Sequence, residues 1–195
     1  MELNEPDVSY NNYTYADYLT WSMDKMVELI KGRVYKMSPA PKKNHQSVSW
    51  RLSGVLYNYL NNKTCKAFTA PFDVRLPTKS THNADITTVV QPDISVICDL
   101  TKLDEAGCIG APDLIVEILS KGNNKKELQN KYEVYEECGV KEYWIINPEE
   151  QNLIVYTLIN GNYKPSKLFT TGDEITTNIL PGLIINLEDI FSDLN

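Results

Sequence analysis

The sequence predicts an α/β protein with a mixed β-sheet flanked by helices, plus additional antiparallel hairpins. Three observations indicate this class: strand patterns in the middle of the chain, a helical pattern that joins two of them, and hairpin patterns on either side. The strands are expected at residues 89–97, 112–120 and 141–147, the helix at 125–138, and the hairpins at 27–37 and 153–169. A strand–helix–strand connection pairs strands in parallel and a hairpin pairs them antiparallel, so the sheet is expected to be mixed.

Length and composition fit a single domain that spans residues 1–195. The chain has 42% hydrophobic and 23% charged residues, as is usual for a globular protein, and is long enough to bury a core. Residues 1–13 are polar and are expected to be loosely ordered. Thr14 is a candidate N-cap for a short helix, and the Lys31-Gly32 turn predicts the first hairpin.

The clearest helix is predicted between the first hairpin and residue 61. Apolar residues follow the spacing of one helix face: Val48, Leu52, Val55, Leu56, Tyr59 and Leu60. His45 lies near the start of this helix. A lone histidine there is more often a capping or packing residue than a catalyst, so both interpretations stay open.

Prolines interrupt two of the predicted strand regions. Residues 65–76 are expected to form one or two strands broken at Pro71, and residues 89–97 a strand broken at Pro92. Residues 101–110 are expected to form a polar connection. The Asn160-Gly161 turn predicts the last hairpin, and residues 187–191 a final turn of helix.

Glu117 lies within the apolar run of residues 112–120, which is typical of a strand buried on both faces. Burying a lone carboxylate costs several kcal/mol, so such a residue is normally paired, protonated or bound to a metal. A structural ion pair or a strand edge open to water would also explain it. Asp93 supplies a second carboxylate on the preceding strand, directly after Pro92.

Two carboxylates on adjacent strands indicate a cation site. They would repel each other unless a cation lies between them, and Mg²⁺ is typically held by one or two carboxylates together with waters and phosphates. Such a site can activate water for phosphodiester hydrolysis, and a nearby lysine would orient the water or neutralise the transition state.

Several segments resemble, in order, the Uma-type family of restriction-endonuclease-like proteins, a branch of the PD-(D/E)XK nuclease superfamily. These segments are residues 28–39, His45, residues 91–93, residues 111–120, Lys131 with Tyr135, and residues 139–148. The resemblance implies a restriction-endonuclease-like fold and a DNA endonuclease that uses Mg²⁺ or Mn²⁺. It implies that Asp93 and Glu117 bind the metal, that Glu28 is an auxiliary ligand, and that His45 positions substrate or a proton.

Leu119 departs from the superfamily pattern, because it stands where the signature has lysine. In the Uma-type branch the lysine comes from the following helix, and Lys131 is the matching position. The four-residue step from Glu127 to Lys131 leaves a plain salt bridge along the helix as an alternative.

Charge and cysteine content lead to expectations about DNA binding, the redox state of the thiols and the location of the protein. A net charge of −7 opposes strong non-specific binding to DNA, so a nuclease would need a local basic surface. Candidates for that surface are Lys42, Lys43, Lys121, Lys125 and Lys126. Four cysteines without a CxxC pair are expected to be reduced thiols, and the absence of a signal peptide or long apolar run predicts a cytoplasmic protein without a membrane partner.

Two other functions stay open on the sequence. One is a non-catalytic nuclease-like module for dimerisation or nucleic-acid binding, and the weaker one is a small-molecule metal hydrolase, since two histidines without ligand spacing give little support. A homodimer is compatible with exposed aromatic residues in the last hairpin: Tyr156, Tyr163 and Phe169. Four further residues are interpreted as structural or surface positions: Asp113 as a turn or cap residue, and Asp73, His82 and Asp85 as surface residues.

Overall fold

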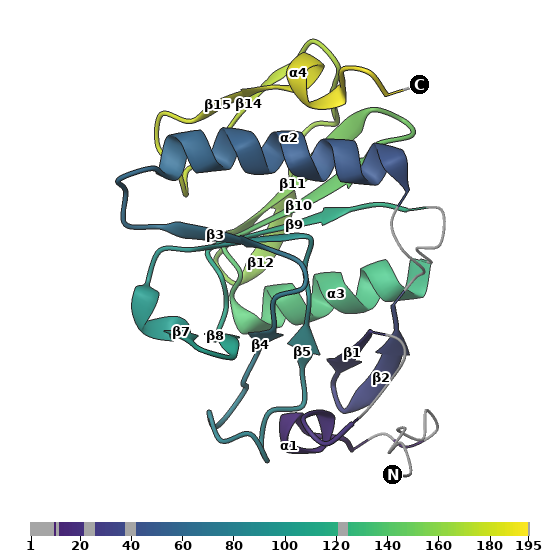
Figure 1. Ribbon diagram of the computed structural model, residues 1–195, viewed down its shortest axis with the longest axis vertical. Helices are drawn as coiled ribbons and strands as arrows, with labels where there is room; N and C mark the ends of the chain where they lie inside the picture. Colours follow the sequence, from purple (N-terminus) through teal and green to yellow (C-terminus); the bar gives the residue numbers. More distant parts are fainter. Residues whose placement is uncertain (1–9, 11, 22–25, 38–41, 121–124, 195) are drawn as a thin grey trace.

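The computed structural model describes residues 10, 12–21, 26–37, 42–120 and 125–194, with a mixed sheet at its centre (Figure 1). The strand order is β12-β11-β10-β9-β6-β3, and β13 pairs with β11. β9 and β10 are parallel and the other pairs are antiparallel, which confirms the predicted mixed α/β class. The strands are β3 (Lys66–Thr69), β6 (Ile94–Ile97), β9 (Leu114–Ile118), β10 (Glu142–Asn147), β11 (Asn152–Ile159), β12 (Asn162–Pro165) and β13 (Phe169–Thr170).

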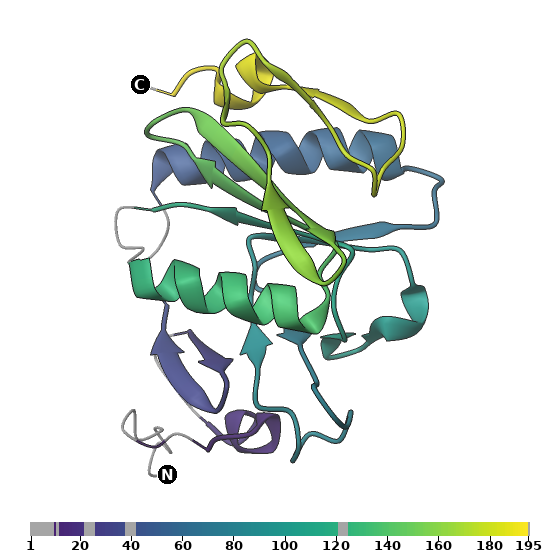
Figure 2. The ribbon, with the colours of Figure 1, turned by 180° about the vertical axis from the view of Figure 1, so that it is seen from behind.

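Helices cover both faces of this sheet, as the two opposite views show (Figure 1 and Figure 2). On one face α2 (Lys43–Leu60) buries Val48, Leu52 and Leu56 against the strands. The same core includes α4 (Leu187–Phe191) and the small hairpin of β14 (Glu174–Thr176) and β15 (Ile184–Asn186). On the other face α3 (Lys125–Cys138) packs Val134 and Tyr135 into a second core.

A second sheet lies beside α3 and has the order β2-β1-β5-β4-β8-β7. Its strands are β1 (Val27–Ile30), β2 (Arg33–Lys36), β4 (Val74–Arg75), β5 (Val89–Val90), β7 (Leu103–Asp104) and β8 (Gly107–Ile109). The last two, preceded by the short helix η1 (Leu100–Lys102), occupy the region expected to be a polar connection. The sequence of this region did not predict strands, because its residues are mostly polar and no apolar face marks β7 and β8. Only a few backbone pairs define them.

The chain passes between the two sheets at the two predicted proline breaks. Pro71 lies between β3 and β4, and Pro92 lies between β5 and β6. Proline cannot donate a backbone hydrogen bond to a strand ladder, so each strand region divides at its proline into two short strands in different sheets. Asp93 therefore lies at the junction of the two sheets.

The helix predictions are confirmed at the ends of the chain. α1 (Tyr15–Tyr18) starts from Thr14, whose side chain forms a capping box with Asp17. α4 covers residues 187–191 as expected. No helix within the described residues is long and apolar enough to cross a membrane.

The expectations for three side chains are wrong: Cys65 and Cys98 are not reduced thiols, and Asp73 is not a surface residue. Cys65 and Cys98 form a disulfide, because β3 and β6 are neighbours and the Lys66–Ile97 pair brings the residues beyond it together. Cys108 and Cys138 are free, as predicted. Asp73 is half-buried and accepts a hydrogen bond from Gln91 Nε2 at 2.8 Å, whereas His82 and Asp85 are exposed as expected.

The aromatic residues of the last hairpin pack inside the protein, so they do not form the exposed surface that was expected for a homodimer. Tyr163 is buried, and Tyr156 and Phe169 are half-buried against the two cores. Tyr132 of α3 contacts the rings of Tyr156 and Tyr163, and Phe169 packs against the core on the α2 side. Exposed aromatic side chains are found instead on α2, where Trp50 is 82% and Tyr57 72% exposed.

Candidate active site

Asp93 occupies the junction between the sheets and is held from two sides. Its Oδ2 accepts a hydrogen bond from the Ile118 backbone N–H at 2.7 Å, and its Oδ1 lies 3.1 Å from His45 Nε2. The side chain keeps 20% exposure, so a solvent-borne ligand can reach it. The β6–β9 register pairs Ile94 with Val116, and continuing it by one residue places Asp93 opposite Glu117. The two predicted carboxylates therefore lie together.

Glu117 is a buried carboxylate on β9, opposite Asp93 in the extended β6–β9 register. Its side chain is 10% exposed, and Oε1 accepts hydrogen bonds from Lys131 Nζ at 2.9 Å and from Tyr135 Oη at 2.7 Å. Burial raises the pKa of the Glu117 carboxyl to about 7, since the loss of hydration and the nearby Asp93 and Glu28 charges outweigh the opposing effect of Lys131. A cation near this carboxylate would favour its ionised form.

Lys131 reaches this carboxylate from α3, although it is 14 positions away in the sequence. Its Nζ lies 2.9 Å from Glu117 Oε1 and 3.0 Å from Glu28 Oε1, and its side chain is 5% exposed. The two carboxylates raise the pKa of Lys131 well above its ordinary value despite the burial, so the amine is a fixed cation at neutral pH. The Glu127 side chain lies outside the described part of the structure, and the described ion pairs of Lys131 go to strand residues.

Glu28 connects the second sheet to this cluster. It lies on β1, is 3% exposed, and its Oε1 accepts a hydrogen bond from the Gln91 backbone N–H at 2.8 Å as well as contacting Lys131. Gln91 immediately precedes Pro92, so this bond fixes the segment that carries Asp93. Its predicted role as an auxiliary metal ligand is a separate matter and stays a prediction.

His45 projects from the first turn of α2 onto Asp93. The N-cap of α2 is Lys42, which makes no side-chain capping bond, and His45 itself is 8% exposed. Within the described residues its Nδ1 has no hydrogen-bond partner, while Nε2 contacts Asp93. The described contacts therefore do not support a capping role for His45.

Sequence reasoning missed Tyr135 as a member of the cluster. The resemblance includes Tyr135 together with Lys131 but gives the tyrosine no role, and its ring is fully buried. Its hydroxyl donates to Glu117, however, and burial together with that carboxylate raises the pKa of Tyr135 well above its usual value. The available signal was its position four residues after Lys131, which places both side chains on one helix face.

Asp113 is a buried carboxylate near the same strand with different partners. Its Oδ2 accepts from the Cys98 backbone N–H at 2.7 Å, and its Oδ1 contacts Lys141 Nζ at 2.6 Å. These bonds join the start of β9 to the end of β6 and to the segment before β10. Asp113 is therefore a structural carboxylate that lies outside the cluster.

Residues 15–188 match the model of the Uma2 family, described as "putative restriction endonuclease". The chain belongs to the Uma2 family. An uncharacterized protein of Synechocystis is 27% identical over 137 residues, covering 69% of this chain and 68% of that protein. The crystal structure of a "putative nuclease" of DUF820 from Anabaena variabilis superposes with a TM-score of 0.74 at 20% identity, covering 94% of this chain and 99% of that one. This likeness confirms the nuclease-like fold.

The Uma2 cluster offers oxygen donors of the kind that Mg²⁺ and Mn²⁺ prefer. Across the described residues, no three side chains among His, Cys, Asp and Glu are close enough to form a ready-made cage. Asp93 and Glu117 nevertheless provide two carboxylates, and the described bonds of Glu117 all go to Oε1. Since Mg²⁺ commonly takes one or two carboxylates and completes its shell with waters and phosphates, this donor set fits.

Proposed function

We propose that this Uma2 protein is a metal-dependent DNA endonuclease that hydrolyses phosphodiester bonds at Asp93 and Glu117. The observation that carries the proposal is the burial of Lys131 between Glu28 and Glu117, beside Asp93. Three carboxylates against one lysine leave two uncompensated negative charges when all are ionised. A buried cluster with that charge needs a divalent cation far more than a purely structural ion pair does.

Each residue of the cluster has a distinct proposed role. Asp93 and Glu117 would hold the cation, with Glu28 as an auxiliary ligand. When bound, a divalent cation lowers the pKa of a water and stabilises negative charge on a phosphate. Lys131 is protonated throughout and therefore acts as a hydrogen-bond donor and positive charge rather than as a base.

Three neighbours position these groups. Tyr135 fixes one Glu117 oxygen, the Ile118 N–H fixes one Asp93 oxygen, and His45 contacts the other Asp93 oxygen. His45 would thereby position the carboxylate and, through it, the substrate. Because each carboxylate is held by donors from different elements, the site needs little rearrangement before reaction.

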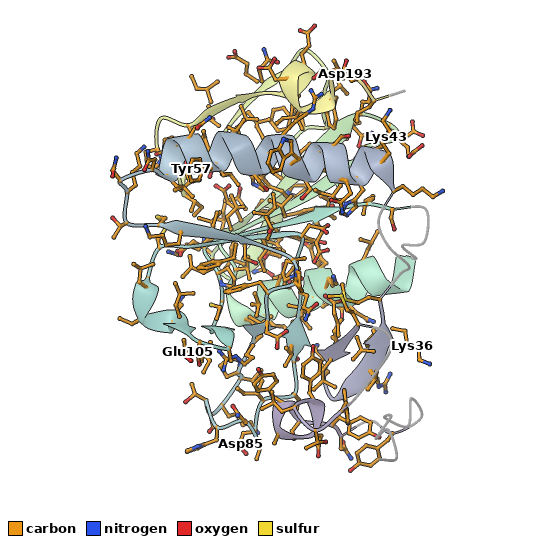
Figure 3. All side chains as sticks on the ribbon, viewed as in Figure 1. Lys36, Lys43, Tyr57, Asp85, Glu105 and Asp193 are labelled. Carbon is orange, nitrogen blue, oxygen red and sulfur yellow. A yellow bond between two sulfur atoms is a disulfide. The ribbon has the colours of Figure 1, made fainter. Side chains whose placement is uncertain are left out.

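The DNA surface in this proposal lies where α2 begins. Figure 3 shows Lys43 at the N-terminal end of α2. Lys43 is exposed, as is Lys42. Lys121 lies outside the described residues, and so do the side chains of Lys125 and Lys126.

The test is cleavage of supercoiled plasmid with Mg²⁺ or Mn²⁺ by the wild type and by Asp93→Asn, Glu117→Gln and Lys131→Ala. Each substitution is expected to lower the rate by about 100-fold or more. Asp113→Asn is the matched control, since it changes a buried carboxylate that lies outside the cluster, and its rate should stay within about threefold.

Metal binding by calorimetry provides an independent measurement. The wild type is expected to bind Mn²⁺, and Asp93→Asn should weaken that binding. Cleavage that survives both carboxylate substitutions would refute the site. No cleavage and no metal binding would instead favour a non-catalytic nuclease-like module.

A further inference from the structure

A pocket of about 480 Å³ lies between the β1–β2 hairpin and α3. Its walls carry Lys31 and Arg33 from the hairpin, Asn130 and Glu133 from α3, and Asn12. Ile30, which is 3% exposed, contributes an apolar surface. The pocket thus combines cations, amides and a carboxylate around a small apolar floor, and none of these groups belongs to the metal cluster described above.

The hairpin register makes this pocket continuous with the candidate active site. Glu28 pairs with Tyr35, and Ile30 pairs with Arg33. Directly opposite residues share one sheet face, and alternate residues of a strand do too, so these four side chains lie on the same face. Glu28 contacts Lys131 at one end of this face, and Arg33 lines the pocket at the other. Ile30 is two positions after Glu28 along the strand, a distance of about 7 Å.

The cationic side of the pocket suits a phosphate group. Arg33 is exposed and forms no ion pair with any residue that the structure describes, so its guanidinium is open to an anionic ligand. Lys31 pairs with Glu137 at 2.7 Å, but both side chains are more than half exposed, which makes that pair weak. An arginine fork binds two phosphate oxygens at once.

The part of the pocket lined by Tyr35 and α3 suits a nucleobase. The Tyr35 hydroxyl accepts a hydrogen bond from Asn130 Nδ2 at 2.9 Å, which holds the half-buried ring at the pocket wall. Aromatic rings bind unpaired bases by stacking, without regard to sequence. The Glu133 carboxylate and the Asn130 carbonyl are acceptors for the N–H groups on a base edge.

We propose that this pocket is a nucleotide subsite, adjacent to the scissile phosphodiester, that accepts an unpaired nucleotide of the DNA strand. The proposal rests on the nuclease function proposed above. Its position about one extended nucleotide from Glu28 places a neighbouring phosphate near Arg33 and its base near Tyr35. A base in a duplex stays stacked and paired and cannot enter a pocket of this kind, so the preferred substrate is single-stranded DNA or a duplex with unpaired ends.

Binding of a labelled single-stranded 12-mer, followed by fluorescence anisotropy in EDTA, tests the subsite without cleavage. Wild type is expected to bind it more tightly than a blunt duplex of the same sequence. Arg33→Ala should weaken binding about tenfold or more, and Tyr35→Leu should also weaken it. Lys36→Ala is the matched control: it removes one exposed positive charge from the same strand but on the other sheet face, and should change binding less than twofold.

Salt dependence separates a direct phosphate contact from a general charge effect. Removing one phosphate contact on a single strand should lower the slope of log affinity against log salt by about 0.7, in Arg33→Ala only. Equal effects of Arg33→Ala and Lys36→Ala, or no binding of single-stranded DNA by wild type, would overturn the subsite. Because Arg33 is exposed, its variant tests the proposal even if Tyr35→Leu fails to fold.

Cleavage assays with Mn²⁺ distinguish failure of the subsite from failure of the nuclease proposal. Arg33-dependent binding without cleavage of any DNA would refute the nuclease function and leave the subsite standing. Carboxylate-dependent cleavage with Arg33→Ala indistinguishable from Lys36→Ala would do the reverse.

Discussion

Replacing Lys131 with methionine removes the positive charge that Glu28 and Glu117 share. Methionine keeps a similar length and leaves no large cavity, so the change acts mainly through the lost contacts at 3.0 and 2.9 Å. Removing one partner of a buried ion pair leaves an uncompensated charge, and the typical cost is about 3 kcal/mol. We expect a loss of about that size in the free energy of unfolding at pH 8.

The loss should depend on pH, because the pKa of Glu117 is about 7 while Lys131 is present. That value is above the unfolded value of about 4.3, so folding favours the protonated form. In the wild type the resulting stability is present at low pH and is lost as pH rises to 7. Without Lys131 the pKa of Glu117 rises further, so the variant continues to lose stability above pH 7. Wild type itself loses a little stability in this range because Glu117 is still titrating, so the deficit relative to wild type should grow by about 1 kcal/mol between pH 7 and pH 8.

Urea denaturation in EDTA at pH 6, 7 and 8 measures this deficit without metal. Lys131→Met combined with Glu117→Gln is compared with Glu117→Gln alone as the control, since Glu117 can no longer take up a proton in either protein. The growth of the deficit with pH should then disappear. A deficit that is constant from pH 6 to pH 8, or growth that persists in the Glu117→Gln background, would refute the charge coupling between Lys131 and Glu117.

Four further changes test the surrounding structure. Asp113→Ala should lower the free energy of unfolding by about 2 kcal/mol because the partly buried backbone N–H of Cys98 loses its acceptor. Lys141→Ala should cost under about 1 kcal/mol, because Lys141 is 64% exposed; equal losses in urea denaturation would contradict this ranking. Reducing or removing the Cys65–Cys98 disulfide, which closes a separation of 33 residues, should cost about 3 kcal/mol, and thiol titration of the unfolded oxidised protein should find two free thiols rather than four. Gly107→Ala should lower the melting temperature, since its φ is 131° and a Cβ would lie 2.2 Å from a backbone carbonyl oxygen; an unchanged melting temperature would show that β8 can shift away.

The helices were the part of the fold that sequence patterns predicted best. The 3.6-residue spacing of Val48, Leu52 and Leu56 reports directly on the buried face of α2, and α3 covers the same residues, 125–138, that were predicted. Helix hydrogen bonds are local, so composition and spacing suffice to predict them. The strands β7 and β8 were missed because they pair with each other over only two residues, and β8 is otherwise held by β4 and by the Asp73 carbonyl, which accepts from Cys108 N–H.

The residues of the candidate site were also predicted only in part from the sequence. Glu117 attracted attention from its sequence alone because a carboxylate in an apolar run needs a partner, and Asp93 followed from the proline that breaks its strand. The hydrogen bond from Tyr135 to Glu117 was not predicted, because a sequence does not show whether a tyrosine in a core also uses its hydroxyl as a donor. Cys65 and Cys98 were also mispredicted, because their pairing depends on the β3–β6 register.

The sequence by itself determined the helices, the proline breaks and the pairing of two carboxylates, Asp93 and Glu117, that it predicts as a cation site. Those features follow from local spacing and from the cost of burying charge, which are properties of short segments. The resemblance pointed to Lys131 on the following helix, but only the tertiary structure decided which carboxylates it contacts. Leu119 leaves no lysine on β9, and the packing of α3 against that strand brings Lys131 Nζ to Glu117 and Glu28 together. A contact between a helix and two sheets depends on how layers pack, and no single segment carries that information.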